Sequence, residues 1–146
     1  ELAGHFSWPV YGRFTRLFGN IPVDPADPAT SVRGLRRAGR LLRQGISLLV
    51  LPEGHRTRDG SLGRFGRGAF SLAVQSGVPV VPVVIAGAFR VLRTGSWRVQ
   101  PGPVRVIVGE PLPPQECREA GVEGLRDRAR ERMQRMLDAA GAPPLS

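Results

Sequence analysis

Lysine is absent from the 146-residue chain, and all 21 of its basic residues are arginine. Against 12 acidic residues they leave a net charge of +9. Guanidinium groups are planar forks that suit phosphate, so this excess favours anionic partners such as lipid headgroups or nucleic acid. With 19 glycines and 14 prolines, the arginine content is equally consistent with a codon bias of the genome.

Cysteine occurs once, at Cys117, which excludes an internal disulfide and a metal cluster built from cysteines. A membrane-spanning helix needs roughly 20 apolar residues. The longest apolar run, Val78 to Phe89, is shorter and is interrupted by Pro79 and Pro82. The sequence therefore predicts neither a transmembrane segment nor a metal site, and it shows no signal peptide. Because the first residue is Glu1 rather than methionine, we expect a fragment or a processed product.

Apolar runs alternate with amphipathic segments along the chain. We expect strands near Ile21, Leu49, Val83 and Ile107. This alternation predicts an α/β fold with a mainly parallel central sheet flanked by helices. The length and the apolar content of 41% are typical of a single domain with its own core.

Three helices are expected after the first strand. Thr30 or Ser31 can cap a helix that runs to about Gln44, where Gly45 stops it. A second helix is expected from about Ala69 to Gly77, and a third follows the prolines at 111–114. The first carries arginines that either form a solvated face or settle on anionic lipid: Arg33, Arg36, Arg37, Arg40 and Arg43. An aromatic helix within residues 2–18 is expected to pack on the sheet or to contact a membrane.

Residues 48–60 are the stretch around which the chain is organised. Leu48 to Leu51 is a short apolar run typical of an inner strand, and Pro52 should end it. Polar residues just beyond the carboxyl end of such a strand lie where α/β sheets bind ligands. Glu53 and Arg56 are therefore candidate site residues, although a solvated charged loop is an equally good explanation.

The run Leu51-Pro52-Glu53-Gly54-His55-Arg56-Thr57 resembles the third sequence block of the glycerolipid acyltransferases, which usually has the form Phe-Pro-Glu-Gly-Thr-Arg-Ser. His55 replaces the customary threonine. The resemblance implies that Glu53 positions the glycerol moiety of an acceptor and that Arg56 pairs with its phosphate. Gly54 would let the backbone approach a ligand closely.

Other blocks of the same family follow in order. Residues 19–25 resemble the second block, but Pro25 stands where the family has arginine. Phe65 and Gly68 match a Phe-x-x-Gly step, and Arg67 between them is expected to assist phosphate binding at a helix N-terminus. An ordinary glycine-rich loop explains that step as well. Pro79 and Pro82 match the fourth block, on the acyl-chain side of the site, or mark a plain core strand.

The family's catalytic His-x-x-x-x-Asp block has no counterpart in this chain. Val10 lies five residues after His5, and Gly60 lies five residues after His55. The resemblance therefore implies that residues 1–146 are part of an acyltransferase-like domain, with the block upstream and no catalytic residue in this chain. We do not favour His55 as a replacement base, because it lacks the orienting aspartate at the family's spacing.

The implied reaction transfers a fatty acyl group from acyl-CoA or acyl-carrier protein to lysophosphatidic acid or a similar glycerol-phosphate acceptor in phospholipid synthesis. No cofactor is expected, because a thioester donor is already activated. The resemblance also implies peripheral binding at the cytoplasmic face of an anionic membrane. Two alternatives stay open: a non-catalytic remnant that binds anionic lipid, and an arginine-rich nucleic-acid-binding domain, for which no recognised motif appears.

Overall fold

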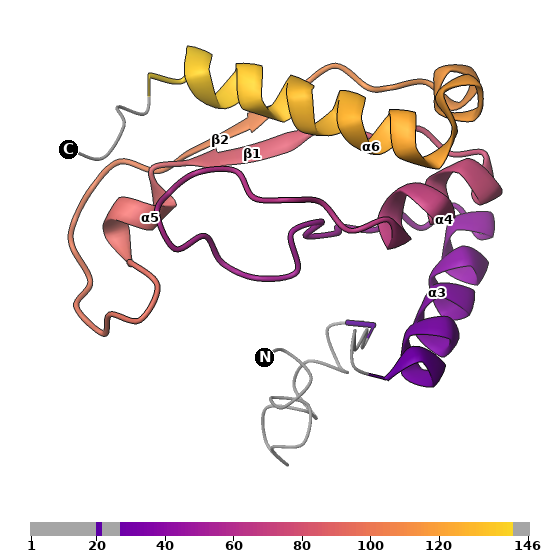
Figure 1. Cartoon of the computed structure of the whole chain (residues 1–146), viewed down its shortest axis with the longest axis horizontal. Helices are drawn as coiled ribbons and strands as arrows, with labels where there is room; N and C mark the ends of the chain where they lie inside the picture. The colour runs from indigo at the N-terminus through magenta and orange to yellow at the C-terminus, as the bar shows by residue number, and fades with distance from the viewer. Residues whose placement is uncertain (1–19, 22–26, 142–146) are drawn as a thin grey trace. The chain divides into compact units, whose positions relative to one another are not determined.

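Figure 1 shows the computed structural model, which describes residues 20–21 and 27–141. The chain divides into two compact units, which are called unit 1 (Glu1–Val50) and unit 2 (Leu51–Ser146) below. This division does not confirm the single domain that the sequence predicts. The aromatic helix expected within residues 2–18 lies outside the described residues, as does most of the 19–25 block, and Ile21 is not part of a strand.

Unit 1 contains one described helix, α3 (Pro28–Arg43). Asp27 caps its N-terminus: the carboxylate oxygen Oδ1 accepts hydrogen bonds from the backbone amides of Ala29 and Thr30, at 2.9 and 3.2 Å. The predicted start at Thr30 or Ser31 is therefore wrong by about one turn. The Thr30 hydroxyl donates to Asp27 Oδ2 and so supports the earlier cap instead of forming its own.

The end of α3 confirms the predicted stop at Gly45. Gly45 has φ +79°, a left-handed conformation that favours glycine. The amide of Ile46 donates to the carbonyl of Leu41, and the amide of Gly45 donates to that of Leu42, each at 3.0 Å. These two bonds satisfy carbonyls that the last helical turn leaves open.

The faces of α3 separate by residue type. Its buried residues, Gly34, Ala38 and Gly39, are small, and Val32 is 47% exposed. All five predicted surface arginines, Arg33, Arg36, Arg37, Arg40 and Arg43, are exposed.

The prediction of an inner strand at Leu48–Leu51 is wrong. Residues 46–51 carry no strand assignment, and the side chains of Leu49 and Leu51 are 87% and 69% exposed. A strand exists only where a neighbour completes its ladder of hydrogen bonds, and no described residue pairs with this run. Apolar composition suggested a strand here, but it did not identify a partner for it.

The described part of unit 2, residues 51–141, contains two strands and three helices. The order along the chain is α4 (Gly68–Ser76), β1 (Val83–Ala86), α5 (Ala88–Val91), β2 (Arg105–Val108) and α6 (Pro114–Ala139). Helix α6 packs against both α4 and β1 (Figure 1). Helix α4 ends at Gly77 in the left-handed conformation, as predicted, and α6 is kinked at Gly121.

Strands β1 and β2 confirm the strands expected near Val83 and Ile107, but they pair antiparallel, with Val84 opposite Ile107. The mainly parallel sheet is not confirmed. A parallel pair needs a crossover that carries the chain back to the starting edge, usually through a full helix. The connection here holds only the four-residue α5, and the chain returns alongside β1 as a wide hairpin (Figure 1).

The core of unit 2 is formed by α4, by α6 and by the segments that precede α4 and follow β2. Leu112 and Leu125 are fully buried, and Phe65 is 7% exposed. The rings of Phe65 and Phe70 stack with their centroids 6.1 Å apart. The other buried members of this cluster are Ala73, Cys117 and Ala129.

Two leucine truncations test this description. Leu125→Ala should lower the free energy of unfolding by about 2–5 kcal/mol, because it leaves a cavity in a packed core. Leu49→Ala should cost under about 0.5 kcal/mol, as at other exposed positions. Urea unfolding of the 146-residue chain measures both. Equal losses of unfolding free energy at the two positions would mean that Leu49 is buried, in contradiction to its exposure in the structure.

Candidate substrate-binding loop

The site loop, residues 52–66, contains the predicted Pro-Glu-Gly-x-Arg turn. Its ends are joined by a hydrogen bond of 2.8 Å from the amide of Gly66 to the carbonyl of Pro52. At the turn itself, the amide of Gly54 donates to the carbonyl of Leu51 at 3.1 Å. Gly54 has φ +72°, so the tight path expected of this glycine is present.

Glu53 is held inside the base of the loop and is half-buried, not the exposed residue that the sequence suggests. Its carboxylate oxygen Oε2 accepts a hydrogen bond of 2.7 Å from the amide of Gly63. A Cβ atom at position 63 would lie 2.7 Å from the same oxygen. Glycine at position 63 therefore gives the carboxylate room to reach the backbone.

Arg130 of α6 contacts the same part of the loop. Its Nε donates to the carbonyl of Gly63 at 2.9 Å, and its Nη2 donates to the carbonyl of Leu62 at 2.8 Å. Sequence reasoning missed Arg130, because nothing in the spacing of two residues 67 positions apart indicates a contact. The density of glycine around position 63 was the one available signal of a close approach.

A small turn at residues 57–61 carries the outer part of the loop. Asp59 accepts hydrogen bonds from the hydroxyl and the amide of Ser61, at 2.6 and 2.9 Å, and from the hydroxyl of Thr57 at 3.1 Å. These bonds, the Ser61 hydroxyl first among them, hold the pKa of the Asp59 carboxyl below its ordinary value. The carboxylate is thus committed to the turn.

His55 has no aspartate partner among the described residues. Its Nδ1 lies 3.3 Å from the carbonyl oxygen of Arg56, and its side chain is exposed. Asp59, the nearest candidate in sequence, bonds to Thr57 and Ser61 instead. That His55 does not replace the family's catalytic base stays a prediction.

Arg56 is exposed, and its guanidinium has no hydrogen-bond or ion-pair partner among the described residues. The same holds for Arg58 and Arg64 within the site loop. Three exposed guanidinium groups therefore lie on one short segment, and their N–H donors have no partner among the described residues. Such groups suit bidentate binding of an oxyanion.

Arg67 lies at the N-cap position of α4 and pairs with Glu123 of α6, with 2.6 Å between Nε and Oε1. Arg126 contacts the other oxygen of Glu123. Arg67 is thus next to a helix N-terminus, as predicted, but its partner is an acid that sequence reasoning missed. No described cleft joins Arg67 to Glu53 and Arg56, so the expected help of Arg67 in phosphate binding stays a prediction.

The two prolines assigned to the acyl-chain side precede β1 rather than lie within it. Pro79 is exposed and Pro82 is buried. Between them, Val80 forms a single antiparallel bridge with Leu112. The carbonyl of Pro82 accepts a hydrogen bond of 2.8 Å from the amide of Gly109, which continues the β1–β2 pairing by one step.

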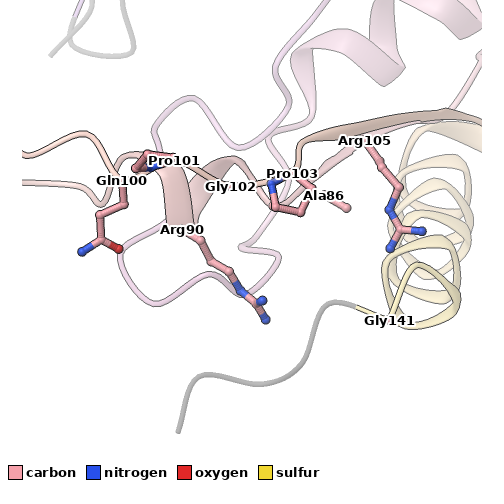
Figure 2. A pocket seen from close by; sticks show the side chains of 9 residues that line it. Ala86, Arg90, Gln100, Pro101, Gly102, Pro103, Arg105 and Gly141 are labelled. Atoms are coloured by element: carbon pink, nitrogen blue, oxygen red, sulfur yellow. The ribbon is translucent and has the colours of Figure 1, made fainter.

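A separate hollow of about 360 Å³ lies in unit 2 (Figure 2). Side chains of Arg90, Gln100 and Arg105 surround it, and Arg105 also donates to the carbonyl of Ala140. None of the predicted substrate-binding residues lines this hollow. Its remaining lining residues are Ala86, Gly87, Pro101, Gly102, Pro103 and Gly141.

Cys117 belongs to the core. It is fully buried, its Sγ donates to the carbonyl of Leu112 at 3.4 Å, and burial raises the pKa of its thiol.

Over residues 20–21 and 27–141, no helix is long and apolar enough to span a bilayer. The same residues contain no grouping of three or more histidine, cysteine or acidic side chains suited to a metal ion.

Comparison with known proteins gives one consistent result. Residues 3–86 match the family described as Acyltransferase. The chain is 40% identical over 110 residues to the chloroplastic 1-acyl-sn-glycerol-3-phosphate acyltransferase BAT2 of Brassica napus. It is 32% identical over 102 residues to the 1-acyl-sn-glycerol-3-phosphate acyltransferase of Pseudomonas aeruginosa. These alignments cover 75% and 69% of this chain.

The crystal structure of the 1-acyl-sn-glycerophosphate (LPA) acyltransferase PlsC from Thermotoga maritima is similar in fold, with a TM-score of 0.80 and 28% identity. The match covers 99% of this chain and 56% of that one. The chain spans only 32% of the length of the Brassica relative and 39% of the Pseudomonas relative.

Proposed function

The chain belongs to the acyltransferase family, and we propose that it forms the acceptor-binding part of an enzyme that acylates lysophosphatidic acid or a similar glycerol phosphate. The observation that carries this proposal is the exposed guanidinium of Arg56. It lies two residues beyond the left-handed Gly54, on a loop whose ends are joined. The names of the relatives support the reaction class, and the loop supports the class of acceptor.

Within this proposal, Arg56 pairs with the acceptor phosphate through two parallel N–H···O bonds. Glu53 binds a glycerol hydroxyl. Its Oε2 is engaged by Gly63, and its Oε1 has no partner among the described residues, so one oxygen remains to accept from a substrate. Arg67 adds positive charge near the N-terminus of α4 while it stays paired with Glu123.

The acyl donor in this proposal is acyl-CoA or acyl-carrier protein, and the segment around Pro79 and Pro82 borders the acyl chain. A thioester carries its own leaving group, so the transfer uses no cofactor.

Deprotonation of the acceptor hydroxyl requires a base that residues 1–146 do not supply. The sequence contains no His-x-x-x-x-Asp pair, and no aspartate among the described residues orients His55. We propose that this pair belongs to sequence outside these residues, and that it acts as the base and its orienting group, as in a hydrolase triad whose nucleophile is the substrate hydroxyl.

The proposed location is the cytoplasmic face of an anionic membrane, where the lipid acceptor resides. Helix α3 supports this assignment with five exposed arginines on a 16-residue segment. Each basic side chain near an anionic surface contributes about 1 kcal/mol to binding. Attraction of this size is sensitive to salt, because it falls off within a Debye length.

Substitution of Arg56 tests the acceptor site. Arg56→Lys should raise the acceptor KM on the order of tenfold in the protein made from the complete gene, because lysine cannot form the bidentate pair. Arg58→Lys is the matched control: the same exposed loop, the same change, and no assigned contact. Steady-state rates and thermal midpoints are measured together. An unchanged KM for Arg56→Lys, or equal effects at both positions, would remove the phosphate assignment.

Purified residues 1–146 should show no appreciable acyltransferase activity, because the base is missing. The assay is thioester release with lysophosphatidic acid and either acyl-CoA or acyl-carrier protein. Protein from the complete gene is the positive control, and it should turn over. Turnover by residues 1–146 on the order of 1 per second would place the base within this chain. An inactive complete protein would contradict the proposed reaction itself.

Replacement of Arg36 and Arg37 by glutamine should weaken binding to vesicles with anionic lipid at low salt, whereas replacement by lysine should leave it nearly unchanged. The expected loss is about 1 kcal/mol per charge removed. Flotation with anionic and neutral vesicles, at two salt concentrations, measures it. Equal binding to both vesicle types would contradict the membrane assignment, and stronger binding to duplex DNA at matched salt would favour the nucleic-acid alternative.

A further inference from the structure

We propose that Glu53 and Arg130 hold the Leu62–Gly63 peptide between them, and that Arg130 is thereby a positioning residue for the substrate loop. Neither charge touches the other. The inference deepens the proposed function and rests on it for its substrate, but the contacts that carry it are independent of the reaction.

The two side chains bind opposite sides of one peptide group. The amide of Gly63 donates to Glu53 Oε2 at 2.7 Å, and the carbonyl of Leu62, in the same peptide plane, accepts from Arg130 Nη2 at 2.8 Å. Arg130 Nε then donates to the next carbonyl, that of Gly63, at 2.9 Å. Three hydrogen bonds to charged groups thus fix one peptide and its neighbour.

The signs of the charges match the dipole of the peptide. A carboxylate lies at its N–H end and a guanidinium at its C=O end, so each charge strengthens the hydrogen bond that the other makes. Both side chains are half-buried, which reduces screening by water. Arg130 forms no ion pair with a carboxylate among the described residues, so the two carbonyls are its principal partners there.

Arginine suits this position because its donors form a fixed fork. Two adjacent backbone carbonyls require two donors at a set separation, and Nε and Nη2 supply them. A lysine ammonium is a point charge and would engage one carbonyl at a time. Gly63 completes the arrangement, because a side chain there would displace the Glu53 carboxylate.

We call the contacts of Glu53 and Arg130 with the Leu62–Gly63 peptide the clamp. The clamp is connected to Arg56, the proposed phosphate-binding residue, through the backbone of the site loop. Arg56 follows Glu53 by three residues, and the backbone between residues 54 and 62 is attached to the core mainly at its ends. One outer attachment is present, from the Thr94 hydroxyl to the carbonyl of Thr57 at 2.5 Å. When the Leu62–Gly63 peptide is released, the loop therefore keeps its outer turn and the Gly66–Pro52 bond, but Glu53 loses the contact that fixes it next to Arg56.

Hydrogen exchange in the protein from the complete gene tests the clamp without any substrate. Arg130→Gln should raise the exchange rate of amides in residues 53–63 on the order of tenfold, because local opening costs less once the charged hydrogen bonds are lost. Gly63→Ala should do the same, although both charged residues remain. Arg130→Lys should lie between wild type and glutamine.

Arg132→Gln is the matched control. Arg132 lies on the same helix and also donates to a backbone carbonyl, that of Glu110 at 3.0 Å, but it does not contact the site loop. This variant should leave exchange in residues 53–63 at the wild-type rate. Equal increases in the Arg130 and Arg132 variants would mean a general loosening of α6 and would overturn the proposal.

Acceptor kinetics connect the clamp to the proposed function. Arg130→Gln and Gly63→Ala should raise the KM for lysophosphatidic acid severalfold and leave the donor KM unchanged, and combined with Glu53→Gln their effects should be less than multiplicative. Faster loop exchange with an unchanged acceptor KM would reduce the clamp to a structural role. If the wild-type protein lacks activity, the proposed function fails, and the exchange rates alone decide whether the clamp exists.

Discussion

The burial of Phe65 against α4 and α6 determines where the site loop meets the rest of unit 2. Its ring stacks on Phe70 and joins the cluster that contains Leu125, while Leu62 packs at the edge of the same cluster. Backbone groups between two anchored apolar residues cannot all reach water, so they need partners within the protein. Glu53 and Arg130 are those partners, which explains why charged side chains lie at the margin of an apolar core.

Signals confined to a few neighbouring residues were sufficient to predict much of the fold. Gly45 and Gly77 end their helices in the left-handed conformation, and the apolar runs at Val83 and Ile107 are strands. The run at Leu48–Leu51 looked the same in composition. It is nevertheless not a strand. Strand formation depends on pairing with another segment of the chain, and a run of leucines and valines does not specify which segment that is.

The motif located Glu53 and Arg56 correctly on one loop, but it did not indicate what holds them. Arg67 was expected to assist phosphate binding at a helix N-terminus, and nothing in the sequence indicated that Glu123 of α6 pairs with it. Contacts of this kind join residues more than fifty positions apart, and opposite charges in an arginine-rich chain offer many possible pairings. Only the path of the backbone selects among them, so a single sequence does not reveal the partner.

Arg56 and Arg130 show how burial assigns different roles to the same side chain. Arg130 is half-buried, and a cation there must be fully hydrogen-bonded to offset its loss of water. Its Nε and Nη2 donate to backbone carbonyls, so these donors add rigidity instead of affinity. Arg56 is exposed, so in the proposed site its guanidinium keeps its water until the acceptor phosphate replaces it. The entropy lost when Arg56 becomes ordered on binding is smaller if its loop is already fixed, and Arg130 provides that fixation.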